Sequence, residues 1–257
     1  MSSEHDQPNN STRGALRLAP NVEDLEEHKR KLPRQFVNFV FYRTRPEWRM
    51  LDDDEKAACK KSFAGVVDDF RSQLLIHTYS TIGLKSNTDF MIWRIGCDLD
   101  PMQEMSGALN CTPMAKYIEP THSLLSMTKR SMYIEKSCAE HAEDRAHLIP
   151  GRTDYLFVCP LQRTREWYTR PQEQRQEMID ENLRIGSKYR SVKLHTTYSF
   201  GLDDQEFVVV FETDNPSDFL DLFQELRESR ASCFTLRDTP MFTCRRRTLA
   251  ECLGALG

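Results

Sequence analysis

The segment His77-Thr-Tyr-Ser-Thr-Ile-Gly-Leu84 has a counterpart later in the chain, His195-Thr-Thr-Tyr-Ser-Phe-Gly-Leu202. The two share His, Thr, Gly and Leu at matching positions, 118 residues apart (195 minus 77). Upstream, Arg43-Thr-Arg-Pro-Glu-Trp48 matches Arg163-Thr-Arg-Glu-Trp167, which is one residue shorter. Because a repeat constrains the fold independently of local propensity, the chain is predicted to contain two halves of similar plan.

Each half is predicted to have the order strand, helix, strand, strand, helix, strand. The first half has strand 36–42, helix 52–71, strands 74–82 and 89–95, helix 99–109 and strand 124–134; the second has strand 155–161, helix 171–186, strands 192–200 and 206–211, helix 216–228 and strand 240–246. This order predicts the α+β class, as two tandem ferredoxin-like modules with both helices on one face of each sheet. The other faces carry Phe, Val, Tyr and Met, so we expect them to pack sheet on sheet, within the chain or between subunits.

The predicted organisation is a disordered arm over 1–32, an N-terminal module over 33–150, a C-terminal module over 151–250 and a tail over 251–257. The 257 residues carry 35 basic and 39 acidic side chains, a net charge of −4. That balance gives no electrostatic reason to expect nucleic acid or an anionic membrane as partner. The absence of a bilayer-length apolar run and of a secretory signal predicts a cytoplasmic protein.

Several kinds of chemistry lack their sequence motifs. The eight cysteines are scattered without a C-x-x-C pair, which predicts reduced thiols. The histidines form no zinc spacing, and no nucleophile elbow or Gly-rich phosphate loop occurs. Structural zinc, serine hydrolysis and nucleotide chemistry are therefore poorly supported.

Two polar residues stand in apolar surroundings in the second half. On the predicted helix 171–186, Met178, Asn182 and Ile185 share one stripe, which puts a neutral amide on a buried face. Glu206 runs directly into the apolar stretch 207–211. Either both are hydrogen-bonded structural residues, or both line a polar-ended ligand pocket between helix and sheet.

Four stretches of the chain resemble the chlorite dismutase family, which includes the coproheme decarboxylases. They are Phe36-Val-Asn-Phe-Val-Phe-Tyr-Arg-Thr-Arg-Pro-Glu-Trp48, Tyr79-Ser-Thr-Ile-Gly-Leu-Lys85 with Asp89-Phe-Met-Ile-Trp-Arg94, Ser199-Phe-Gly-Leu-Asp-Asp-Gln-Glu-Phe207, and Leu236-Arg-Asp-Thr-Pro-Met-Phe-Thr-Cys-Arg245. The resemblance covers about residues 33–250. It implies a dimeric α+β barrel built from the two modules, and a homo-oligomer that is usually a pentamer.

The resemblance also implies a heme site in the C-terminal module, where the family's iron-binding histidine falls on Asn182. Glu206 matches the carboxylate that orients that histidine. On the opposite side of the heme the family has an arginine or a glutamine. Counting from the ligand position places this residue at His195, and counting back from the motif 199–202 places it at Leu194. The reactive tyrosine of the decarboxylases falls on Cys159. Trp167 and Arg163 match an aromatic wall and a contact to the propionates.

Three hypotheses follow for the function. One is a known activity of the family, but chlorite dismutation is doubtful without the arginine, and coproheme decarboxylation is doubtful without the tyrosine, because the chemistry uses each group directly. The first choice is a heme-associated, peroxidase-like oxidoreductase with an altered iron site, in which heme b or coproheme is bound by His195. The alternative is a non-catalytic scaffold or sensor that binds a porphyrin or small anion, or nothing, with Arg163, Arg165, Arg170 and Arg184 available for anionic groups.

Overall fold

The computed structural model describes residues 33–129, 131, 133 and 147–257. The chain divides into two units, Met1–Pro33 and Arg34–Gly257, and the second holds every element named below. The arm predicted for residues 1–32 lies outside the described residues. Within the described part of the chain, no helix is long and apolar enough to cross a membrane.

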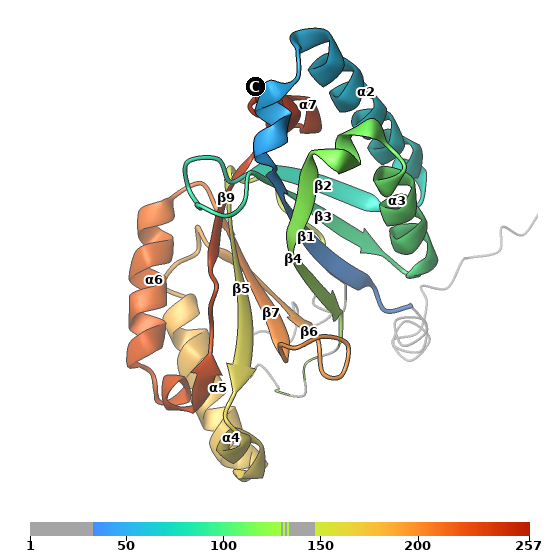
Figure 1. Cartoon of the computed structure of the whole chain (residues 1–257). Helices are drawn as coiled ribbons and strands as arrows, with labels where there is room; N and C mark the ends of the chain where they lie inside the picture. The colour runs from blue at the N-terminus through green and yellow to red at the C-terminus, as the bar shows by residue number, and fades with distance from the viewer. Residues whose placement is uncertain (1–32, 130, 132, 134–146) are drawn as a thin grey trace, which may run out of the picture. The chain divides into compact units, whose positions relative to one another are not determined.

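The first half of the unit Arg34–Gly257 has the predicted order of elements (Figure 1). They are β1 (Phe36–Thr44), η1 (Pro46–Met50), α2 (Asp53–Asp69), η2 (Phe70–Ser72), β2 (Leu75–Ser80), β3 (Phe90–Gly96), α3 (Asp100–Asn110), η3 (Pro113–Lys116) and β4 (Ile118–Met127). Helix α2 begins at a capping box in which Asp52 and Glu55 each bind the other's backbone N–H. The strands pair antiparallel in the order β4-β1-β3-β2.

The second half repeats that plan with additions. Its elements are β5 (Tyr155–Arg163), α4 (Arg165–Thr169), α5 (Gln172–Gly186), β6 (Lys193–Tyr198), β7 (Phe207–Thr213), α6 (Pro216–Glu228), η5 (Arg230–Phe234), β8 (Thr235–Arg237), β9 (Phe242–Arg246) and α7 (Leu249–Gly254). The strand order is β6-β7-β5-β9, again antiparallel, and β8 pairs with β5.

The two sheets join at both edges to form one closed ring of strands. β4 meets β6 through Met127 and Tyr198, and β2 meets β9 through Tyr79–Arg246 and Ser80–Arg245. The interior is filled by apolar side chains from both halves: Val37, Phe39, Phe41, Tyr79, Met91, Trp93, Ile95, Leu124, Leu148, Leu156, Val158, Val208, Val210, Phe242 and Cys244. The sheet-on-sheet packing expected from the sequence therefore occurs within the chain.

The helices lie outside the barrel. Helices α2, α3 and α7 cover the N-terminal sheet with one apolar cluster, and α5 and α6 lie on the C-terminal sheet (Figure 1). The repeated sequence motif marks equivalent turns after β2 and β6. Gly83 and Gly201 have φ of 74° and 71° there, a conformation that side chains with a Cβ rarely adopt.

The structure adds α4 and β8 to the predicted elements, and β4 ends at Met127, before residues 128 and 129 of the predicted strand. Two further differences concern the start of β4 and the end of the chain. β4 begins at Ile118, six residues before the predicted Leu124, because Pro120 is accommodated where the β1–β4 register shifts between Phe41 and Tyr42. Residues 249–254, predicted as the end of the second module and part of a tail, form α7. Its residues Leu249, Cys252 and Leu253 belong to the apolar cluster of the N-terminal half.

The packing of α7 predicts that the end of the chain stabilises the opposite half. Leu253 is 2 % exposed, so Leu253→Ala should lower the free energy of unfolding by about 3 kcal/mol through lost burial and a cavity. Urea denaturation measures this change. The control Leu220→Ala, at an exposed position of α6, should stay within about 0.5 kcal/mol. Equal effects of the two variants would contradict the assigned packing of α7.

Candidate functional site

One face of α5 points at the outer side of the C-terminal sheet. Met178 is buried there with Trp167 and Ala231, and Ile185 packs into the cluster that contains Phe157 of β5. Asn182 lies between these two apolar contacts, and its Oδ1 is shielded from solvent without a hydrogen-bond partner among the residues that the structure describes. Arg175, two turns earlier on the same stripe, has an Nε in the same condition. The stripe thus carries two unsatisfied polar atoms.

Glu206 is a hydrogen-bonded residue just before β7. Its Oε2 accepts from the backbone N–H of Arg163 at 2.7 Å and from the Tyr168 hydroxyl at 2.5 Å. Burial and then the hydrogen bond to Glu206 raise the pKa of Tyr168 well above its usual range, so its hydroxyl stays a donor. Of the two polar residues singled out in the sequence, Glu206 fits the structural alternative, whereas the Oδ1 of Asn182 has no partner.

Arg163 and Trp167 stack on one another beside this carboxylate. The Arg163 guanidinium lies 5.0 Å from the centre of the Trp167 ring. Its Nη1 donates to the Ala231 carbonyl at 2.6 Å and to the Thr235 hydroxyl at 3.1 Å. Burial lowers the pKa of Arg163 from its ordinary value. Two donors of Arg163 are therefore directed at the protein itself.

The other three arginines expected to hold anionic groups have different surroundings. Arg170 pairs with Glu166, and Arg184 donates from Nε to the Asp180 carbonyl at 3.3 Å. Arg165 is an exposed residue of α4. Arg175, which the sequence analysis missed, is the arginine on the buried stripe. The i, i+3, i+7 spacing of Arg175, Met178 and Asn182 was the available signal.

Cys159 and Leu194 lie on the outer face of the sheet. The Cys159 thiol donates to the Asp238 carbonyl at 3.3 Å, and burial raises its pKa to about 12, so it is protonated at neutral pH. Leu194 is opposite Phe211, which packs against α6, and is half-exposed. Leu194 therefore faces the same side of the sheet as Asn182.

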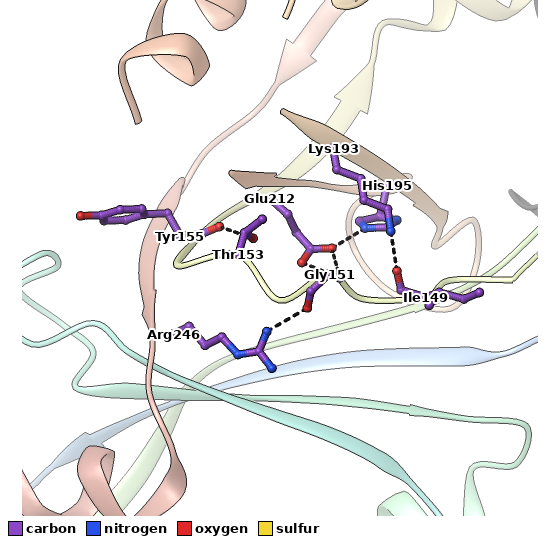
Figure 2. A network of polar contacts seen from close by, with 8 residues as sticks. All are labelled: Ile149, Gly151, Thr153, Tyr155, Lys193, His195, Glu212 and Arg246. Atoms are coloured by element: carbon purple, nitrogen blue, oxygen red, sulfur yellow. Dashed lines mark hydrogen bonds and ion pairs between the residues drawn. The ribbon is translucent and has the colours of Figure 1, made fainter. Parts of the chain in front are cut away.

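His195 points the other way, into the barrel. It is opposite Val210, a residue of the barrel interior, and its ring lies 6.4 Å from that of Trp93. Its Nε2 lies 2.5 Å from Oε1 of the buried Glu212, whose two oxygens also accept from the Gly151 N–H at 2.9 and 2.8 Å (Figure 2). His195 does not share a site with Asn182, because the sheet lies between them.

The outer face does not supply an iron ligand at the expected place. An amide oxygen binds heme iron poorly, the Cys159 thiol is protonated, and Met178 is enclosed by Trp167 and Ala231. No group of three His, Cys, Asp or Glu that could hold a metal ion occurs among the residues described. The side chains around Asn182 thus do not fit ligation of heme iron.

Comparison with known proteins identifies the fold and the relatives. The sequence model of the family described as Chlorite dismutase matches residues 55–247. The chain belongs to the chlorite dismutase family. The α+β class and the family resemblance predicted from the sequence are both confirmed.

The relatives include proteins with two named activities. A coproheme decarboxylase from Mycolicibacterium smegmatis is 28 % identical over 64 % of this chain and 70 % of its own length. One from Staphylococcus carnosus is 26 % identical over 71 % and 79 %. The structure of chlorite dismutase from Candidatus Nitrospira defluvii in complex with imidazole has a TM-score of 0.80 at 22 % identity, covering 90 % of this chain and 98 % of that one. The last similarity concerns the fold.

The His195–Glu212 contact predicts a pH-dependent contribution to stability. Burial alone would raise the pKa of Glu212, but hydrogen bonds from His195 and Gly151 outweigh burial and hold it below its ordinary value. Glu212→Gln should therefore lower the free energy of unfolding by about 3 kcal/mol at neutral pH. The stabilisation from Glu212 is complete above the unfolded-state pKa and is lost as the pH falls through the lower folded-state pKa.

Urea denaturation of both proteins between neutral pH and acid checks this expectation. The difference in free energy of unfolding between wild type and Glu212→Gln should become smaller as the pH falls below the ordinary range of carboxyl pKa values. Glu225→Gln, which disrupts an exposed pair with Lys188, is the matched control and should have a much smaller effect. A difference in free energy of unfolding that is independent of pH would contradict a stabilising role for the charge of Glu212.

Proposed function

We propose that the chain is a non-catalytic, porphyrin-binding member of the chlorite dismutase family. The porphyrin would lie between α5 and the outer face of the C-terminal sheet, and no side chain of the protein would ligate iron. The pair of unpartnered atoms on the buried stripe of α5, Arg175 Nε and Asn182 Oδ1, carries this proposal.

Buried polar atoms are nearly always hydrogen-bonded, so two unpartnered ones on one helix face indicate a surface that binds something. The Arg175 guanidinium can donate to a carboxylate through its free Nε. Met178, on the same stripe, forms an apolar cluster with Trp167 and Ala231. A flat ring with acidic substituents matches this combination, and the relatives named coproheme decarboxylases act on such a molecule.

Iron-centred chemistry finds less support in the same residues. Heme b or coproheme would supply a redox-active iron. Asn182 offers that iron an amide where an imidazole would be basic enough to bind it. The oxidoreductase alternative depends on His195, whose nearest partners are Glu212 and Trp93 inside the barrel. The non-catalytic alternative requires no such ligand.

Asn182→His tests the proposal by restoring an imidazole at this position. Titration with hemin and with the corresponding metal-free porphyrin, followed by absorbance, should give wild-type affinities within about threefold of each other, because iron adds no bond. Asn182→His should bind hemin about tenfold tighter than wild type, with a five-coordinate histidine spectrum, and should leave metal-free porphyrin binding unchanged.

Asn182→Gln is the matched control, since it keeps the amide and lacks the imidazole. It should behave like wild type toward both ligands. Failure of wild type to bind either porphyrin would contradict the proposal. So would a strong preference of wild type for hemin, because that result requires an iron ligand that the proposal denies.

A further inference from the structure

Arg94 is a buried cation without an acidic partner. It lies on the outer face of β3 in the N-terminal half and is 5 % exposed. Its guanidinium donates to Asn38 Oδ1 from Nε at 3.2 Å, to the Met102 carbonyl at 3.0 Å and to the Ser106 hydroxyl at 2.8 Å. All three acceptors are neutral. Among the residues that the structure describes, none forms an ion pair with Arg94.

This arrangement is unusual for a charge so far from water. Buried charged side chains are normally paired with an opposite charge, because neutral hydrogen bonds replace only part of the lost hydration. Tyr42 does not supply a counter-charge, since burial raises its pKa and keeps the hydroxyl protonated. Burial also lowers the pKa of Arg94, but a guanidinium remains charged at neutral pH.

A cavity of about 470 Å³ adjoins the partners of Arg94. Its lining combines amide and hydroxyl groups with apolar side chains and contains no acidic residue: Asn38, Leu99, Met102, Gln103, Ser106, Gly107, Asn110, Ser123 and Leu125. Asn38 and Ser106 both line the cavity and bind Arg94, so the positive charge lies directly behind one end of it. The volume is in the range of small-molecule sites.

We propose that this cavity binds a small organic carboxylate. The carboxylate group would lie at the Asn38–Ser106 end, where it neutralises the field of Arg94. Arg94 is not itself part of the lining, and its Nη1 and Nη2 donate to Met102, Ser106 and Asn38, so it would attract the carboxylate through its charge and not through a direct hydrogen bond. The apolar part of the ligand would contact Leu99, Met102 and Leu125.

This site is independent of the proposed porphyrin site. It lies between α3 and the strands of the N-terminal half, whereas Asn182 and Arg175 belong to α5 in the other half. Its ligand needs neither a flat ring nor iron.

Hexanoate is a suitable probe, and hexan-1-ol is its neutral counterpart. Binding is measured by calorimetry and by thermal shift of the full chain, at ionic strength matched with chloride. Hexanoate should bind with a Kd in the millimolar range or tighter, as expected for a ligand of this size, and hexan-1-ol at least tenfold more weakly. Arg94→Met should remove the preference for the carboxylate.

Gly107→Leu keeps the experiment decisive even if Arg94→Met fails to fold. Gly107 lines the cavity on α3, and a Cβ there would meet no atom within 4 Å beyond its own stretch of helix, so a leucine side chain can start from this position and occupy the cavity. Gly65→Leu on α2 is the matched control, because a Cβ there is equally free and Gly65 is not part of the lining. Hexanoate affinity should fall at least tenfold in Gly107→Leu and stay unchanged in Gly65→Leu.

Three results would overturn the proposal. They are the absence of saturable hexanoate binding by wild type, equal affinity for hexanoate and hexan-1-ol, and unchanged hexanoate affinity in Gly107→Leu. Porphyrin binding by Gly107→Leu should equal that of wild type, so loss of one site is distinguishable from loss of the other.

Discussion

Closure of two antiparallel sheets into one barrel is the constraint on which the other features of this chain depend. Successive side chains of a strand point to opposite faces, so closure assigns every second residue to the interior and the others to the helix-covered outside. The assignment separates His195 from its neighbour Leu194. A histidine that could serve as a metal ligand from the outer face instead binds Glu212 inside the barrel.

The interior and the exterior satisfy their buried charges differently. Glu212 has a histidine and a backbone N–H on its oxygens, so its charge is compensated within the chain. Arg94 lies outside the barrel among neutral acceptors and lacks a counter-charge among the described residues, and Arg175, also outside, donates from Nη1 to the Tyr133 hydroxyl at 3.5 Å. Since both lie on helix-covered faces, the outer surfaces of the two sheets are where this fold leaves charge available for ligands.

The repeat predicted the fold well, because it reports a duplicated plan directly, and the predicted bounds of α6 agree with the structure. The repeated motif also forms equivalent turns, at Gly83 and Gly201, in the two halves. Other features depended on contacts distant in sequence. Gly151 reaches Glu212 across 61 residues, and no local pattern indicates that bond. The sequence also did not decide which face of the sheet His195 occupies. The two alignments placed the family position at His195 or at Leu194, and neighbouring residues of a strand point to opposite faces.

Asn182 lies where a substitution can alter a ligand site without altering the fold. The residue belongs to α5, outside the ring of strands, and its stripe neighbours Met178 and Ile185 pack into clusters other than that of the barrel interior. In the proposed function the amide of Asn182 takes the position of an iron-binding imidazole, and a substitution there would leave the barrel core intact. Leu194 and Cys159 also lie on the outer face, so substitutions at these positions would likewise leave the packing of the barrel interior unchanged. The stability of the barrel therefore places little constraint on which small molecule, if any, its outer faces bind.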